Sequence, residues 1–166
     1  TSSVTLNSNS GVSYTGTNAN FDINNGTTLT INGIVSGSGA MTKLGTGNLT
    51  LSGVNTYTAS TTINAGTISI STDSGLGAAP GSPSAGHLTL NGGTLESIAD
   101  FTLNSNRGIA LGASNGIIDV NSSTTLTYGG IMAGSGTLTK VDSGSLTLSG
   151  VNTYSGSTTI SAGTIS

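Results

Sequence analysis

The side chains that could do acid–base chemistry are few in this chain. Six carry a carboxylate and one carries an imidazole: Asp22, Asp73, Glu96, Asp100, Asp119, Asp142 and His87. General acid–base catalysis needs such groups to converge in one place. Asp22 and Asp119 hold the same position in an internal repeat described below, which separates them along the molecule. Glu96 and Asp100 are close in sequence, but only Arg107 is available as a neighbouring cation. We therefore expect no catalytic site.

The metal-ligating residues do not form a recognisable pattern. There is no cysteine, which excludes disulfides, thiolate metal sites and cysteine nucleophiles. Calcium-binding β-solenoids repeat Gly-Gly-x-Gly-x-Asp at their turns. The nearest string, residues 91–96 (Asn-Gly-Gly-Thr-Leu-Glu), lacks the aspartate and occurs once. His87 is interpreted as a solvated loop residue, and no metal or cofactor is expected.

The residues that must position any site belong to one long repeat. Residues 37–69 return as residues 134–166 at an offset of 97, with identical residues at 24 of 33 positions. Weaker matches extend the repeat upstream, so that residues 1–69 correspond to 98–166 and residues 70–97 occur once. A fixed period is typical of repeat architectures. We expect one continuous domain over residues 1–166 that is a piece of a longer array.

The local pattern predicts short strands. Apolar–polar–apolar triplets such as Leu29-Thr30-Ile31 and Leu49-Thr50-Leu51 recur about every 20 residues and end in turn dipeptides such as Asn32-Gly33. This spacing predicts an all-β, parallel β-solenoid with about 20 residues per coil, hence about five coils per 97-residue period and about eight in the chain. An antiparallel sandwich, the alternative fold, would show turns about every 8–12 residues and more aromatic residues.

Within each coil the apolar residues should point inward and the glycines should mark corners. The inward set comprises Leu49, Leu51, Ile63, Ile68 and Ile70, and the corner glycines include Gly37, Gly39, Gly45, Gly47 and Gly66. The segment 70–97 contains two prolines and several glycines. It is predicted to be a loop that leaves one coil.

Composition excludes several classes of partner. The net charge is −3, only 5% of residues are charged, and the cations are Lys43, Arg107 and Lys140. Nucleic acid and anionic membrane surfaces require clustered basic residues, so neither is expected as a partner. No apolar run approaches the roughly 20 residues that span a bilayer. Membrane insertion by this segment is therefore not expected.

The repeated motif reads Gly-Ser-Gly-x-Leu-x-Lys, then Gly-x-Leu-x-Leu-x-Gly-x-Asn-x-Tyr, then Thr-x-Ile-x-Ala-Gly-Thr. It resembles the autotransporter-associated β-strand repeat of passenger domains in bacterial type V secreted surface proteins. The resemblance implies a right-handed parallel β-helix, export across the outer membrane and a place at or beyond the cell surface, but no particular activity. Ala59 stands where the family has glycine, and Asp142 replaces Gly45. The motif positions expected to be structural are Gly37, Gly39, Lys43, Gly47, Leu49, Leu51, Gly53, Asn55, Tyr57, Ile63 and Gly66 in the first copy, and Gly134, Gly136, Lys140, Gly144, Leu146, Leu148, Gly150, Asn152, Tyr154, Ile160 and Gly163 in the second.

Two repeated polar residues have specific interpretations. Lys43 and Lys140 are expected to lay their stems on the coil, with the ammonium either in water or bonded to a backbone carbonyl at a corner. Tyr57 and Tyr154 are expected to cover a corner with the ring half-buried and the hydroxyl in water.

The function expected from these observations is structural: an extracellular stalk, spacer or fibre of a bacterial surface protein, without catalysis. An adhesin with a ligand site on the 70–97 loop or on a Thr/Asn-rich face is the alternative, and ice binding by Thr-x-Thr ranks is a minor one. Expected partners are neighbouring repeats of the same chain and further copies, end to end or side by side. An uncapped solenoid end exposes unpaired strand edges, which favours such association.

Overall fold

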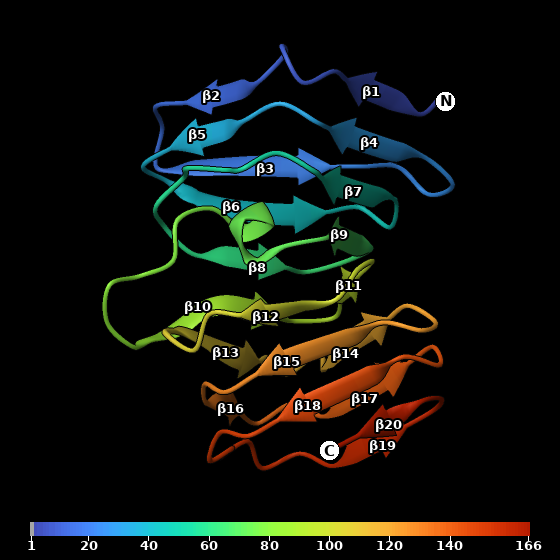
Figure 1. Cartoon of the computed structure of the whole chain (residues 1–166). Coiled ribbons are helices and arrows are strands. Elements are labelled where there is room, and N and C mark those ends of the chain that lie inside the picture. Colours follow the sequence, from blue (N-terminus) through green and yellow to red (C-terminus); the bar gives the residue numbers. More distant parts are fainter. Residues whose placement is uncertain (1) are drawn as a thin grey trace.

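Every strand in residues 2–166, the part of the chain that the structure describes, pairs in parallel with strands one turn away along the chain. The computed structural model is an all-β solenoid whose turns stack from the N-terminus at one end to the C-terminus at the other (Figure 1). Parallel strands stack about 4.8 Å apart, so each turn supports the next through its backbone hydrogen bonds. The predicted fold class, an all-β parallel β-solenoid, is confirmed.

One side of the solenoid is an eight-stranded sheet that runs its full length. Its strands, in order, are β1 (Val4–Leu6), β4 (Thr28–Ile31), β7 (Asn48–Leu51), β9 (Thr67–Ile70), β11 (Thr94–Ser97), β14 (Gly116–Val120), β17 (Leu138–Val141) and β19 (Thr158–Ile160).

A second side is a six-stranded sheet. It consists of β3 (Asn18–Asp22), β6 (Ala40–Leu44), β8 (Thr61–Ile63), β10 (Ser84–Leu90), β13 (Arg107–Leu111) and β16 (Met132–Gly134).

The third side is discontinuous. It begins with β2 (Val12–Tyr14) and β5 (Val35–Gly37), and it ends with β12 (Phe101–Leu103), β15 (Thr125–Tyr128), β18 (Ser145–Leu148) and β20 (Thr164–Ile165). Between these two sheets, residues 55–58 hydrogen-bond to β5, through Thr56 N to Val35 O (2.9 Å). A short 3₁₀ helix, η1 (Asp73–Leu76), follows on this side. None of the described residues forms a helix with the length and apolar character needed to cross a membrane.

The coils differ in length. Seven successive steps along the eight-stranded sheet span 25, 20, 19, 27, 23, 22 and 20 residues. The mean is about 22 residues per turn over about seven turns. The predictions of about 20 residues per coil and about eight coils are therefore slightly wrong, because three coils carry extra residues at their corners.

The 97-residue period is not a whole number of turns. Leu29 lies on β4 of the eight-stranded sheet, and four further turns along that sheet lead to β14. Its repeat equivalent, Leu126, lies on the next strand, β15, on the third side. Each motif in the second copy is thus displaced by four turns plus one side of the solenoid. The prediction of five coils per period is wrong, and equivalent residues face different directions.

The interior consists of aliphatic ladders. Leu29, Leu49, Ile68, Leu95 and Ile118 stand opposite one another on successive strands of the eight-stranded sheet. The predicted inward residues are confirmed, since each side chain of the set Leu49, Leu51, Ile63, Ile68 and Ile70 is at most 1% exposed.

The prediction that residues 70–97 form a loop is wrong for half of that segment. Ile70 ends β9, and β10 and β11 lie within the two neighbouring turns of the solenoid. Only residues 71–83, which include η1, leave the coil. The proline and glycine content marks this shorter stretch and a register shift in β10 between Ser84 and Leu88. Alternation in Leu88-Thr89-Leu90 was the signal for the strand.

The buried ladder predicts the cost of truncation. We expect Leu49→Ala to lower the free energy of unfolding by about 2–5 kcal/mol, because it removes buried methyl groups and leaves a cavity. Val54, a few residues later in the same coil, is 67% exposed, and Val54→Ala should stay within about 0.5 kcal/mol. Urea denaturation of both variants measures the difference. Equal losses would contradict the assignment of an aliphatic interior.

Candidate functional site

The repeated lysine is the most unusual feature of the motif. Lys43 occupies an inward position on β6, in register with Phe21 and Ile63 of the neighbouring coils, and its side chain is fully buried. Its Nζ donates to Leu44 O (2.6 Å), Gly45 O (2.7 Å) and Ala65 O (3.3 Å). The ammonium therefore binds the carbonyls of a corner and links it to the next coil. Of the two interpretations, an ammonium in water is wrong, and bonding to backbone carbonyls is confirmed.

The second lysine reproduces this corner on another side of the solenoid. Lys140 on β17 is fully buried, and its Nζ donates to Val141 O (2.6 Å), Asp142 O (2.7 Å) and Ala162 O (3.4 Å). Asp142, which replaces Gly45, keeps the left-handed backbone of the first copy, with φ of 59° against 65°. Aspartate tolerates this conformation better than most residues. The substitution therefore preserves the corner.

Burial decides the electrostatics of both lysines. Desolvation lowers the pKa of Lys43, and the negative charge of Asp22 partly opposes this change. Desolvation likewise lowers the pKa of Lys140, against the raising effects of Asp119 and Asp142. Neither ammonium forms an ion pair among the described residues. Carbonyl oxygens are thus the direct partners of both charges.

The conserved asparagine of the motif joins neighbouring coils. Asn55 is 3% exposed; its Oδ1 accepts a hydrogen bond from Val35 N (2.8 Å), and its Nδ2 donates to Gly75 O (2.7 Å). In the second copy, Asn152 Oδ1 accepts from Met132 N (2.9 Å). Both copies use the amide to satisfy a backbone group where the chain turns between two sides of the solenoid.

The tyrosines differ between the two copies. Tyr57 is fully buried, and its hydroxyl hydrogen-bonds to Thr61 Oγ1 (2.8 Å). Burial raises its pKa well above the usual range. The prediction of a half-buried ring with a hydroxyl in water is wrong for Tyr57, because the residues of the insert cover it: Ala78 N donates to Tyr57 O (2.9 Å). Tyr154, in the last coil, is partly exposed and pairs with Thr158 Oγ1.

Two motif glycines are required by close backbone approach. A Cβ on Gly47 would lie 2.2 Å from Asn24 O, and one on Gly150 would lie 1.8 Å from Gly130 O. Real Cβ atoms do not approach oxygen so closely, so any side chain at these positions would push neighbouring coils apart.

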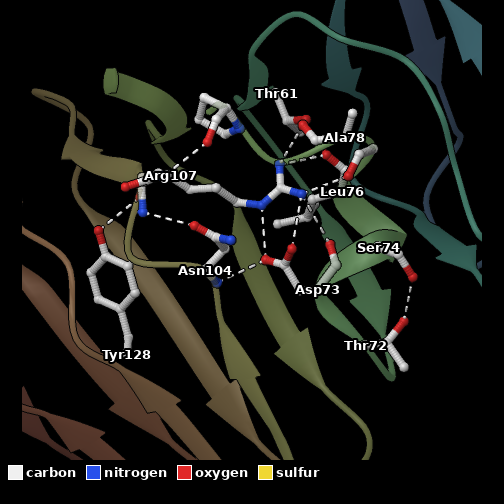
Figure 2. Close-up of polar contacts among 12 residues, drawn as sticks. Thr61, Thr72, Asp73, Ser74, Leu76, Ala78, Asn104, Arg107 and Tyr128 are labelled. Atoms are coloured by element: carbon white, nitrogen blue, oxygen red, sulfur yellow. Dashed lines mark hydrogen bonds and ion pairs between the residues drawn. The ribbon is translucent and has the colours of Figure 1, made fainter. Parts of the chain in front are cut away.

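The insert is held by a buried arginine that the sequence analysis did not select. Arg107 on β13 is fully buried, and Figure 2 shows its guanidinium surrounded by Asp73 and backbone carbonyls. Its Nε donates to Asp73 Oδ1 (2.8 Å) and its Nη2 to Asp73 Oδ2 (3.1 Å), a bidentate pair. Nη1 also donates to Leu76 O (2.8 Å) and Nη2 to Gly77 O (2.6 Å).

Further bonds fasten the same region, which we call the insert clamp (Asp73, Asn104, Asn106, Arg107 and Tyr128). Asn104 N donates to Asp73 Oδ1 (2.9 Å) and Asn106 Nδ2 to Pro80 O (2.9 Å). Tyr128 Oη donates to Arg107 O (2.7 Å), and burial raises the pKa of Tyr128 to about 12. The first copy has serine at the position of Arg107. This departure from the repeat was the one sequence signal of the clamp.

The single histidine is buried and is not a solvated loop residue. His87 on β10 is 7% exposed, and its Nδ1 has no hydrogen-bond partner among the described residues. Desolvation and the positive charge of Arg107 lower its pKa. The interpretation of His87 as solvated is wrong because β10, read as part of a loop, is an inner strand of the six-stranded sheet.

A groove lies beside the insert on the six-stranded side. It has a volume of about 440 Å³, and its lining is mainly apolar. Small outward residues of β13 and β16, Ala110 and Ala133, lie on one side of it, and Pro83 and Ala85 lie on the other. This is the largest of the described cavities, and no titratable side chain lines it.

The carboxylates are dispersed, as expected from the repeat. Glu96 and Asp119 are register partners on adjacent strands, whereas Asp73 pairs with Arg107. No group of three or more His, Asp or Glu side chains within residues 2–166 is arranged to hold a metal ion.

The lysine corner predicts a stability effect. Lys43→Met should lower the free energy of unfolding by about 2 kcal/mol, because corner carbonyls lose their donor. Thr42→Ala, which changes the neighbouring outward residue, should stay within about 0.5 kcal/mol. Chemical denaturation of the two variants measures both values. A neutral Lys43→Met would show that the ammonium has no net stabilising role.

The insert clamp predicts local release. Arg107→Met should lower the free energy of unfolding by about 3 kcal/mol, because it leaves Asp73 and several carbonyls without their donor. Hydrogen exchange should accelerate in residues 77–83 but not in β4 or β7. Asp73→Asn, which keeps the carbonyl bonds of Arg107, should have a smaller effect. Unchanged exchange of residues 77–83 in Arg107→Met would contradict the clamp.

The partly buried Asp119 predicts a pH dependence. Its Oδ1 has no partner among the described residues, and burial, with Glu96 and Asp142 nearby, raises its pKa. The folded state therefore holds this proton more tightly than the unfolded state, and the associated stability is lost as pH rises through the folded-state pKa. Asp119→Asn should raise the melting temperature at neutral pH, with a gain that shrinks in acid. Asp100→Asn is the control, because Asp100 Oδ1 already accepts from Thr125 N (2.6 Å); an equal gain there would contradict the explanation.

Sequence comparisons match the repeated corners. A family model described as "Passenger-associated-transport-repeat" matches residues 41–70 and 138–166. Each matched segment contains the buried lysine, the asparagine and the tyrosine of one motif copy. The chain is also 38% identical over 140 residues to the "Adhesin BmaC autotransporter" of Brucella suis biovar 1 (strain 1330). That alignment covers 84% of this chain but only 4% of the relative. No solved structure matches the chain.

Proposed function

The chain belongs to the autotransporter passenger repeats, and from this premise we propose that it is a stiff structural segment of a bacterial surface protein. Repeats of this kind are secreted to the cell surface or the extracellular space. The proposed role is that of a stalk or spacer, in which the solenoid itself carries load and sets distance.

The observation that carries the proposal is the unbroken eight-stranded sheet. Its strands follow one another through seven steps in parallel register, from β1 to β19. Backbone hydrogen bonds in this sheet run along the solenoid axis, so axial extension must break them. At about 4.8 Å per turn, seven turns span roughly 34 Å. Each repeat thus adds a fixed length of rod.

The use of the charged residues agrees with this role. Lys43 and Lys140 bond to corner carbonyls, and Arg107 bonds to Asp73 and the insert. All three cations of the chain are buried in contacts that hold coils together. We propose that the segment has no catalytic activity, because the groups that would supply positive charge to a reaction serve structural contacts.

Its partners in this proposal are further coils of the same protein. The relative is far longer than this chain, since the alignment covers 4% of it. Coils before β1 and after β20 would continue the parallel sheets. The expected association of free ends follows from the same edges.

A second candidate function, adhesion, is favoured by one observation: the apolar groove between the insert and β16. The relative is called an adhesin. Small outward residues, Ala110 and Ala133, leave room there for a flat apolar group of a partner. The Thr rank proposed for ice binding receives less support, because Thr5, Thr30 and Thr50 are followed in register by Ser69, Glu96 and Asp119.

The experiment places variants in the parent surface protein. Deleting residues 70–97 is unsuitable, because it would remove β10 and β11 together with the loop. Instead, Ala133→Arg fills the groove with a charged side chain, and Thr62→Arg on β8 of the same sheet is the control. The structural proposal expects normal surface display and attachment of cells for both variants. Loss of attachment with Ala133→Arg alone would overturn it in favour of adhesion.

A direct measurement of rod behaviour completes the test. Replacing the segment in the parent by an unrelated solenoid with the same number of turns should preserve passenger length, seen by electron microscopy, and cell attachment. A flexible linker with the same number of residues should not preserve the length. If the linker works equally well, the stiff-spacer proposal is wrong.

A further inference from the structure

The chain contains four Asn-Gly steps: Asn25-Gly26, Asn32-Gly33, Asn91-Gly92 and Asn115-Gly116. Such steps are prone to a spontaneous reaction, because glycine has no side chain to hinder its backbone nitrogen. That nitrogen attacks the Cγ of asparagine, ammonia leaves, and a succinimide forms. Water then opens the ring at either carbonyl and gives aspartate or isoaspartate. The net reaction consumes one water and releases one ammonia, so no other reactant is needed.

Two of the steps are locked by hydrogen bonds on both reacting groups. Asn115 Oδ1 accepts from Thr137 N (3.0 Å), and Gly116 N donates to Thr137 O (2.9 Å). Asn91 Oδ1 accepts from Ser114 N (3.2 Å), and Gly92 N donates to Asn115 O (2.7 Å). Attack at either step first requires local opening of the solenoid.

The third step is confined by packing. Gly33 is buried, and a Cβ on it would lie 2.5 Å from Ser10 O. Asn32 N donates to Leu6 O (2.9 Å) in the next coil. The backbone therefore has little room to bring Gly33 N onto the Asn32 side chain.

The fourth step is open. Asn25 and Gly26 are both exposed and form the turn between β3 and β4. No heavy atom lies within 4 Å of the position that a Cβ on Gly26 would take. Neither the Asn25 side chain nor Gly26 N has a hydrogen-bond partner among residues 2–166. The turn is held only at its edges, where Thr27 N and Oγ1 donate to Asn24 O (3.1 and 2.7 Å).

We propose that Asn25 is a site of spontaneous modification, at which the folded chain converts to aspartate and isoaspartate while its other Asn-Gly steps stay intact. The reaction adds a carboxylate at an outer corner of the solenoid, and isoaspartate also lengthens the main chain there. This property is independent of the proposed structural role. A surface protein is not renewed in place, so the product would accumulate with the age of the molecule.

The second repeat copy provides a natural control. Ser122 and Ser123 occupy the positions of Asn25 and Gly26, and Ser123 has a left-handed φ of 64° against 71° for Gly26. Thr124 N and Oγ1 donate to Asn121 O (3.0 and 2.7 Å), as Thr27 does to Asn24. The same turn thus forms without a reactive step, so Asn25→Ser should preserve the fold.

The experiment incubates the folded chain in mildly alkaline buffer at physiological temperature. Trypsin cuts after Lys43, Arg107 and Lys140, which places Asn91 and Asn115 in separate peptides from Asn25. Tandem mass spectrometry resolves Asn25 from Asn32 and follows replacement of the amide by a hydroxyl group. Isoaspartate is detected with an isoaspartyl methyltransferase. Asn25 should react about tenfold faster than Asn91 or Asn115, because those steps must open first. Asn25→Ser should abolish the signal from this turn.

The same chain in urea separates structure from local sequence. There the four steps should react at similar rates, because the hydrogen bonds that protect Asn91 and Asn115 are absent. If Asn25 reacts no faster than Asn115 in the folded chain, the proposal is wrong. It is also wrong if Asn25 is singled out to the same degree in urea, since the selectivity would then come from its neighbours in sequence.

Discussion

The parallel register of the eight-stranded sheet is the constraint on which the rest of the structure depends. Because each strand lies directly on the one from the previous turn, inward side chains form continuous ladders, such as Leu29–Leu49–Ile68. A coil can vary in length only at its corners, where 19 to 27 residues per turn are accommodated without breaking the ladder. Glycines such as Gly47 and Gly150 are required where these corners of neighbouring coils approach. Axial hydrogen bonding and the apolar interior therefore reinforce one another.

The corners create a problem that the ladder alone does not solve. A tight turn directs several carbonyls into a region with no strand to donate to them, and leaving such groups unpaired is costly. Lys43 and Lys140 solve it from inside, since each extends an aliphatic stem along the apolar ladder and places its ammonium among the carbonyls. Asn55 does the same with an amide where the eight-stranded side meets the third side. The few charged residues of the chain thus serve as internal connectors.

The insert shows how a repeat accommodates a unique segment. Residues 71–83 interrupt the third side, and the insert clamp restores contact between the coils above and below through Arg107 and Asp73. Beside it, the small residues of β13 and β16 leave a groove. The 97-residue offset equals four turns plus one side of the solenoid, so the two motif copies point in different directions. A ligand surface built from one motif position would therefore not form a flat, repeated face, which agrees better with a structural role of the motif.

The sequence by itself determined the repeat, the all-β class, the parallel solenoid and the inward ladder, because these depend on local alternation and on a period that is visible in one chain. It also marked the lysines as repeated, but their burial depends on whether a corner from the next coil covers them. Only the tertiary structure decided the rotation between copies, since that is the sum of all coil lengths, including the insert. It also decided the pairing of Arg107 with Asp73, because these residues are 34 positions apart and meet only after a full turn of the solenoid. His87 and β10 were misread for the same reason: proline and glycine describe a local bend, whereas burial depends on the coil that lies against it.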